Sequence, residues 1–359
     1  MIRAMTGRVV CAAITLVLAL APPARAQDSS ATLGDTAYVA GQYQVFTGAG
    51  EPASIDDVVA AMGRHQVVFI GETHDDPTGH MLEAELFARA YESYGVAGAN
   101  GGTARPVVLS LEFFQRDVQP ILDEYLAGLI TEKSFRNDSR PWPRYETDYR
   151  PLIEFAKEHG LAVIAANAPR RYVTRVSQHG RESLEDLSPE ARATLPPLPY
   201  GQPSPEYRRQ WIQTISQVME QEGLKCGVPL PPREAGDTGA RAAAPPGTHD
   251  NMGNQLHSQV LWDASMAFAV SQSLAAQPDA LVLHLVGGFH VERGTGTPEH
   301  LEAYRPGTSR MIVALRPVDE IAVFQPAPDG AWGDFVIQTD KSRTLEAIEC
   351  RRYRAEREK

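Results

Sequence analysis

The chain has 359 residues, 45 of them acidic and 34 basic, which gives a formal net charge of −11 at pH 7. This acidic balance argues against nucleic-acid binding, which needs a basic face toward the phosphates, and it suits anionic membrane surfaces poorly. The length is sufficient for one large domain or two small ones.

The first 26 residues have the pattern of a signal peptide. Arg3 and Arg8 precede an apolar run from Val9 to Ala21, and Ala24-Arg25-Ala26 supplies an A-x-A cleavage site. The run is shorter than the roughly 18 residues that span a bilayer. We therefore expect a secreted or periplasmic protein with no transmembrane segment. A lipoprotein anchor at Cys11 is not expected, because the residue before it is not small.

Two cysteines remain after the predicted cleavage, Cys226 and Cys350. In an oxidising compartment they can form a disulfide, and the alternative is two unrelated thiols. The sequence contains no CxxC or CxxCH motif, which argues against covalent haem attachment and against structural zinc.

Apolar, β-branched runs predict buried strands, and helical patterns fill the gaps between them. The predicted strands are Gln66–Ile70, Val107–Leu111, Leu161–Ala165, Leu281–Val286, Met311–Leu315 and Asp334–Gln338. The predicted helices are Met81–Tyr94, Val118–Gly128, Tyr149–His159, Glu206–Glu222 and Ser258–Ala275. Nearly continuous apolar strands are typical of a parallel sheet covered on both faces. The order of elements predicts a three-layer α/β sandwich around a mostly parallel sheet.

We expect residues 27–340 to form a single domain, followed by a charged C-terminal tail at 341–359. Residues 195–256 interrupt the strand and helix order, because proline-rich stretches lie on both sides of the predicted helix Glu206–Glu222. We interpret this region as a helical lid with a flexible loop at Gly227–His249, and the alternative is a solvated insertion without a role.

Polar groups follow four of the predicted strands. The first strand ends in Gly71-Glu72-Thr73-His74, the second in Glu112, the third in Asn167 and the fourth in Gly287-Gly288-Phe289-His290. Ligands bind at the carboxyl ends of strands in open α/β sheets, so these groups are expected to meet at one edge.

Two histidines with nearby carboxylates suit a divalent transition metal. The candidate ligands are His74, His290, Glu72, Glu112 and Asp263. For each, an ordinary hydrogen-bonded role is the alternative.

An aromatic cluster, Trp142 to Tyr149, links the second and third strand units. A tyrosinate can bond ferric haem iron, so Tyr145 and Tyr149 are candidate cofactor contacts, and packing is the alternative for each. His80, on the first turn of the helix after the first strand, is a third candidate. The sequence lacks G-x-S-x-G, HExxH and phosphate-binding glycine motifs, which argues against serine hydrolases and nucleotide enzymes.

Several ordered motifs between Val67 and Val318 resemble the ChaN-like haem-binding uptake family. They are Gly71–Asp75, Glu112–Phe114, Tyr149–Leu152 with Phe155-Ala156, Asn167–Arg170, Leu261–Ala267 and Gly287–His290 with Gly294 and Gly296. This family is related to the Tiki proteins and more remotely to the erythromycin esterases.

The resemblance implies an exported α/β protein with a helical part, tied to haem or iron acquisition. It implies haem pairs held face to face in a homodimer, with a tyrosine as axial ligand and with histidine and lysine contacts to the propionates from the partner subunit. In the Tiki branch, paired G-x-x-H turns look like a peptidase metal site. The chain departs from the family in lacking the lipoprotein cysteine and in its proline-rich linker.

Two functions follow from the sequence. The first is an exported haem-binding protein in haem or iron uptake or handling. The second is a divalent-metal-dependent hydrolase, a peptidase or esterase, in which Glu72 or Glu112 acts as general base on a metal-bound water.

Overall fold

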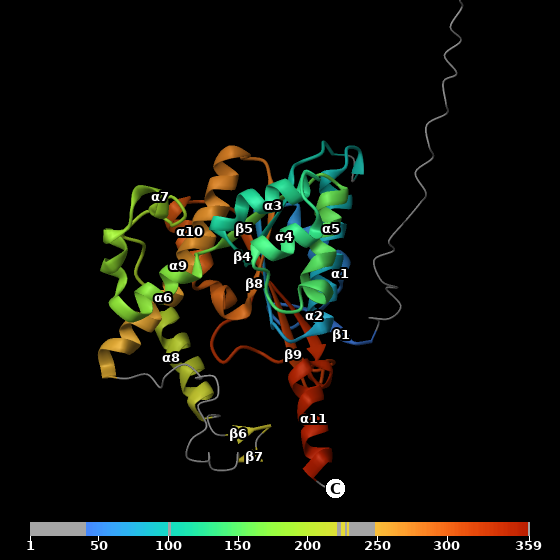
Figure 1. Cartoon of the computed structure of the whole chain (residues 1–359). Coiled ribbons are helices and arrows are strands. Elements are labelled where there is room, and N and C mark those ends of the chain that lie inside the picture. Colours follow the sequence, from blue (N-terminus) through green and yellow to red (C-terminus); the bar gives the residue numbers. More distant parts are fainter. Residues whose placement is uncertain (1–40, 100–101, 221–223, 227, 230–247, 358–359) are drawn as a thin grey trace, which may run out of the picture.

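The computed structural model describes residues 41–99, 102–220, 224–226, 228–229 and 248–357. The predicted signal peptide and most of the predicted loop Gly227–His249 lie outside these ranges. Figure 1 shows the chain as helices arranged around one large sheet.

Eight strands form this sheet. They are β1 (Tyr43–Thr47), β2 (Pro52–Ala53), β3 (Val67–Glu72), β4 (Val107–Gln115), β5 (Ala162–Asn167), β8 (Leu281–Gly287), β9 (Arg310–Val318) and β10 (Phe335–Asp340). Their order is β2-β1-β10-β9-β3-β8-β4-β5. Strands β10 to β5 are parallel, whereas β1 pairs antiparallel with β10 and with β2. All six predicted strands are present, and the antiparallel edge was not predicted.

Helices cover both faces of the sheet. They are α1 (Ile55–Met62), α2 (Pro77–Ala90), α3 (Gln119–Leu126), α4 (Glu132–Ser139), α5 (Arg150–Glu158), α6 (Arg170–His179), α7 (Pro189–Arg192), α8 (Pro205–Glu220), α9 (Thr248–Ala276), α10 (Thr297–Tyr304) and α11 (Leu345–Arg357). Helix α2 begins at Pro77, four residues before the apolar pattern that starts at Met81, because the Asp76 side chain accepts a hydrogen bond from the Thr78 amide at 3.0 Å and Pro77 occupies the first turn.

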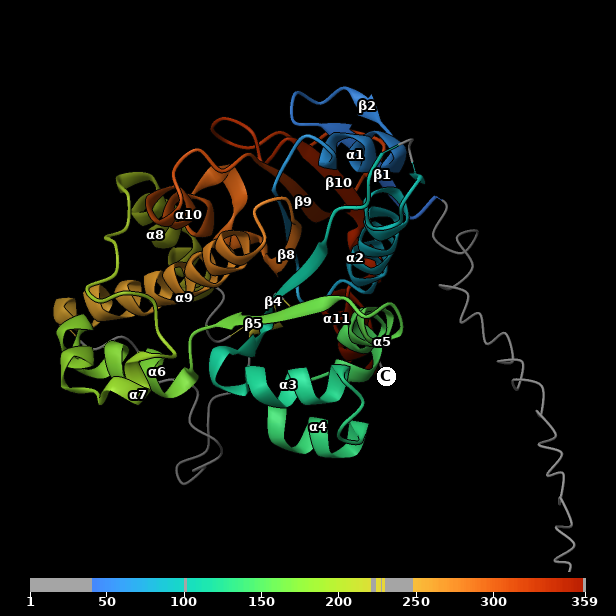
Figure 2. The ribbon, with the colours of Figure 1, turned by 90° about the horizontal axis from the view of Figure 1, so that it is seen from above.

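Strand β3 shows why these runs are apolar throughout. Val68 and Ile70 belong to the core beneath α1, α2, α3 and α5. Val67 and Phe69 point to the opposite face and belong to the core beneath α9 and α10. Since successive side chains point to opposite faces, a strand covered on both sides needs apolar residues at every position. Figure 2 shows helices on both sides of the sheet, as expected for a three-layer α/β sandwich.

A third core joins α6, α8 and α9. Tyr207 and Trp211 of α8 pack there with Val173 of α6 and Leu261 of α9. The predicted helix in residues 195–256 is therefore packed against the body of the protein, and its tyrosine reaches the edge of the sheet described below.

The C-terminal residues 345–357 form α11, which begins beside β3. The amides of Leu345 and Glu346 donate to the backbone oxygen and side chain of Asp75, both at 2.9 Å. Cys226 and Cys350 form a disulfide with their Cα atoms 5.2 Å apart. Within the described ranges, no helix combines the length and apolar character needed to cross a bilayer.

Reducing this disulfide should lower the stability of the protein. The disulfide links two cysteines that are 124 residues apart in the sequence. Closing a loop of this size is expected to stabilise the fold by about 3–5 kcal/mol, because it restricts the unfolded chain. The free energy of unfolding, measured in guanidinium with and without dithiothreitol, should fall on reduction. The Cys226→Ser/Cys350→Ser variant serves as control and should not respond to dithiothreitol. Equal stability of oxidised and reduced wild-type protein would contradict the expectation.

Candidate functional site

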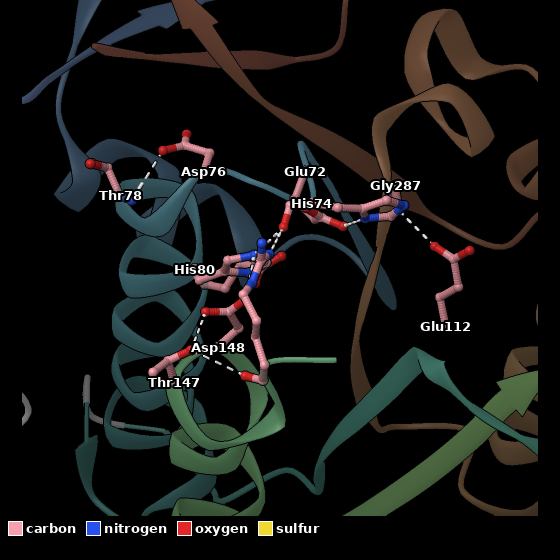
Figure 3. Close-up of polar contacts among 11 residues, drawn as sticks. Glu72, His74, Asp76, Thr78, His80, Glu112, Thr147, Asp148 and Gly287 are labelled. Carbon is pink, nitrogen blue, oxygen red and sulfur yellow. Dashed lines mark hydrogen bonds and ion pairs between the residues drawn. The ribbon is translucent and has the colours of Figure 1, made fainter. Parts of the chain in front are cut away.

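Polar side chains meet at the carboxyl edge of the sheet. Strands β3, β8, β4 and β5 are parallel neighbours, so the residues that follow them come together. Figure 3 shows Glu72, the last residue of β3, and His74, which follows it, lying near Gly287 of β8 and Glu112 of β4. Asn167, at the end of β5, uses its side-chain oxygen to accept a hydrogen bond from the Ala168 amide at 2.8 Å.

His74 is the exposed imidazole of this edge. Its side chain is 50% exposed, whereas the side chain of Glu72 is fully buried, and the two are joined through Nδ1 of the ring. Burial acts to lower the pKa of His74, but the hydrogen bond and charge of Glu72 outweigh it, so the pKa is raised. The ring lies edge-on to Trp142 with 5.0 Å between centroids. Among the described residues, no hydrogen bond is made to Nε2, which leaves that nitrogen available to a ligand.

His80 lies beneath His74 and is buried. Its Nδ1 is 3.0 Å from Glu83, and its Nε2 is 3.1 Å from the backbone oxygen of His74 and 3.5 Å from Asp148. Burial opposes protonation, but Glu83, Glu72 and Asp148 together raise the pKa of His80 to about 10. A protonated His80 donates from both ring nitrogens, so it supports the loop that carries His74.

His290 belongs to a second buried network. Its Nδ1 is 2.8 Å from Asp263, which also accepts from Tyr207 at 2.5 Å and from Thr297 at 2.9 Å. Burial acts to lower the pKa of His290, but the charge and hydrogen bond of Asp263, with the charge of Glu112, raise it to about 9. Asp263 thereby fixes the orientation of the imidazole.

Glu112 lies between the two histidines. It accepts from the Gly287 amide at 2.8 Å, and its other oxygen is 3.8 Å from Nε2 of His290. A Cβ atom at Gly287 would lie 2.9 Å from Cε1 of His74 and 3.6 Å from Glu112. Only glycine therefore lets the exposed histidine approach β8 so closely.

The predicted divalent-metal site is not supported. Within the residues that the structure describes, no three His, Cys, Asp or Glu side chains are arranged to hold a metal ion. The physical reason is that each candidate carboxylate already engages at least one oxygen, although the second oxygen of Glu72 has no hydrogen-bond partner among the described residues. Glu72 is paired with His74, Asp263 with His290, Tyr207 and Thr297, and Glu112 with a backbone amide.

The two candidate tyrosines lie behind the site. Tyr145 is 3% exposed and Tyr149 is 1% exposed, and Tyr149 stacks on Phe113 with 4.0 Å between ring centroids. Burial raises the pKa of both phenols far above the ordinary value, which disfavours the tyrosinate that bonds ferric iron. Their buried position indicates that both tyrosines pack in the core and do not lie on a surface where haem could bind.

Sequence reasoning missed several partners in these networks. Glu83 lies three residues after His80 on α2. Side chains three residues apart on a helix are neighbours, so this contact could have been predicted from the sequence. Tyr207 and Thr297 reach Asp263 from other helices, 56 and 34 residues away in the chain, and no local pattern identifies such pairs.

The profile of the family described as "Haem-binding uptake, Tiki superfamily, ChaN" matches residues 58–301. The chain belongs to this family. A curated relative, Protein RETICULATA-RELATED 5, chloroplastic, of Arabidopsis thaliana, is 24% identical over 264 residues, which are 70% of this chain and 31% of that protein. The chain thus spans about a third of that relative's length.

A solved structure shares the fold. The structure described as cofacial heme binding to ChaN of Campylobacter jejuni has a TM-score of 0.56 at 15% identity, covering 82% of this chain and 96% of that one. A mutant of the erythromycin esterase EreC in its open conformation has a TM-score of 0.39 at 11% identity, covering 83% of each chain.

Replacing Asp263 should lower the pKa of His290. Because this pKa is raised, the stability contributed by the pair is complete below the ordinary histidine value of about 6.5 and is lost as the pH rises through about 9. In Asp263→Asn, burial should dominate and bring the pKa to about 6.5 or below. An NMR titration of the histidine Cε1 protons measures it. His284, whose pKa burial lowers to about 3, is an internal reference that stays neutral. Titration of His290 near pH 9 in the variant would contradict this account.

Proposed function

We propose that this protein binds haem at the carboxyl edge of its sheet and that His74 bonds the iron. The observation that carries the proposal is the environment of His74, an exposed imidazole held through Nδ1 by buried Glu72. Metal-bound histidines commonly donate their second ring nitrogen to a carboxylate, which fixes the tautomer and increases the basicity of the ligand. Membership of a haem-binding family supports the same ligand.

The surroundings of His74 suit a flat aromatic cofactor. The half-buried ring of Trp142 stands beside the imidazole and packs on Phe113 with 5.2 Å between centroids. Trp142, supported from behind by the buried Phe113, therefore offers an apolar surface next to Nε2 of His74. Bound iron would supply the redox and ligand chemistry, while Glu72, His80 and Gly287 hold His74 in position.

We also propose export and a role in haem or iron uptake or handling. Arg3, Arg8 and the apolar run to Ala21 support export, and the Cys226–Cys350 disulfide suits an oxidising compartment. Cofacial heme binding in the ChaN of Campylobacter jejuni suggests that two copies of this chain hold a haem pair between them. The mass of the protein in solution with and without haemin tests this arrangement.

Haemin titration of the histidine and tyrosine variants tests the iron ligand. His74→Ala should weaken haemin binding at least about tenfold, equivalent to ~1.4 kcal/mol, and should shift the Soret band. Tyr145→Phe and Tyr149→Phe should leave the Soret band unchanged because both rings are buried. His179→Ala, at an exposed histidine at the end of α6, is the matched control.

An unchanged spectrum in His74→Ala, together with a shift in either tyrosine variant, would assign the iron to a tyrosine instead. A non-saturating response of the wild-type protein would remove haem binding altogether.

A second candidate function is acid–base hydrolysis without a metal, and the pairing of His290 with Asp263 favours it. A buried aspartate that orients a histidine is the arrangement of the hydrolase triad. Because the pKa of His290 is about 9, this residue is protonated at pH 7 and suits the role of general acid, with Glu112 3.8 Å away as the neighbouring base.

Release of p-nitrophenol from an ester substrate tests the second function. Activity should survive a chelator, should disappear in His290→Gln, and should fall as the pH rises through about 9. Activity that is lost with chelator, or that persists in His290→Gln, would contradict it.

A further inference from the structure

A surface pocket of about 790 Å³ opens beside the proposed haem site. It lies between α4 and the segment Arg140–Tyr145, and Trp142 lines it while also contacting His74. The residues of its wall that matter for ligand binding are Lys133, Arg136, Arg140, Trp142, Arg144 and Tyr145.

The wall of this pocket is basic although the whole chain is acidic. It contains four cations and two carboxylates, Glu132 and Glu146, in a protein with a formal net charge of −11. Arg150, which is not part of the wall, holds Glu132 at 2.6 and 3.0 Å. Among the described residues, Lys133 makes no ion pair. Asp117 and Asp148, which also lie outside the wall, pair with Arg140 and Arg144. Lys133 is therefore the cation of the wall whose charge an anionic ligand can satisfy first.

Two of the arginines can exchange their present partners for a ligand. Arg136 and Glu146 are 43% and 51% exposed, and an ion pair this exposed contributes little to stability. Arg140 is 48% exposed and lies 2.7 Å from Asp117, which is 15% exposed but also pairs with Arg171 and keeps that partner if Arg140 turns away. A guanidinium can bind a carboxylate through two parallel hydrogen bonds.

The backbone of the segment Arg140–Tyr145 is held in an unusual conformation. Arg140 and Arg144 have φ angles of 53° and 63°, in the left-handed region that residues other than glycine rarely adopt. Pro141 and Pro143 stiffen the chain between them. Arg144 is fixed by Asp148 at 2.6 Å and by the backbone oxygen of His74. The surrounding structure thus holds this segment in a conformation that presents Trp142 and the cations together.

Tyr145 forms the inner part of the pocket wall. It is 3% exposed, and the guanidinium of Arg136 lies over its ring at 5.7 Å from the centroid. The buried ring therefore supports Arg136 at the pocket and does not itself meet a ligand.

We infer that this pocket binds the carboxylates of the porphyrin, with Arg136 and Arg140 as the residues that recognise them. The inference rests on the proposed haem function, because it places the propionate side of the ligand at the pocket and the iron at His74. If the inference is correct, two arginines of this same chain make the protein prefer a porphyrin with free carboxylates to the corresponding ester.

A comparison of metal-free protoporphyrin IX with its dimethyl ester tests the inference. Without iron, binding does not depend on an axial ligand. In a fluorescence titration the wild-type protein should bind the acid at least about tenfold more tightly than the ester. Arg136→Gln/Arg140→Gln should reduce this ratio toward one. Arg64→Gln/Arg208→Gln, at two exposed arginines outside the pocket, is the charge-matched control and should keep the ratio. Thermal unfolding confirms that each variant is folded.

The outcomes separate this inference from the iron-binding proposal. An unchanged ratio in Arg136→Gln/Arg140→Gln, or no preference in the wild-type protein, overturns the inference even if haemin binds. Loss of the preference in that variant supports the inference. If the preference depends on the two arginines but haemin does not bind wild-type protein, the pocket binds porphyrin carboxylates and His74 does not bond iron.

Discussion

Asp263 has no exposed surface, and its carboxylate accepts hydrogen bonds from His290, Tyr207 and Thr297. These three partners lie on the turn after β8, on α8 and on α10, so one buried charge on α9 connects four elements. A buried carboxylate is costly unless it is fully paired, and its pairing therefore requires all four to be in place. The same requirement anchors α8 to the edge of the sheet where the candidate site lies.

The sheet could be predicted because its strands are buried on both faces. The core positions of β3, such as Val68 and Phe69, belong to opposite layers, and double burial leaves an apolar run that the sequence shows directly. The strand β1 (Tyr43–Thr47) was not predicted, since it has only five residues and mixed burial, with the two-residue strand β2 on its outer side. Helix α11 likewise depends on the distant Asp75 for its first hydrogen bonds.

The sequence predicts which residues lie at the site but not all of the hydrogen bonds between them. Parallel strands deliver their ends to one edge, so the placement of His74, His290 and Glu112 together follows from topology. His74 and His80 use carboxylates two and three residues away in the chain, whereas the pairing of His290 with Asp263 depends on the distance between two elements, which the sequence does not contain. The predicted metal site was not supported for this reason: Glu72 and Asp263 each serve a histidine as hydrogen-bond partners and do not share one ion with it. The buried positions of Tyr145 and Tyr149 also arise from packing.

We propose that haem binds at the carboxyl edge of the sheet, with its iron at His74 and its propionates toward α4. A crystal structure of the haemin complex tests this arrangement. We expect the iron to be bonded to Nε2 of His74, with Glu72 still paired with Nδ1 and the propionates beside Arg136 and Arg140. Iron bonded to a tyrosine, or haem bound away from Trp142, would contradict it.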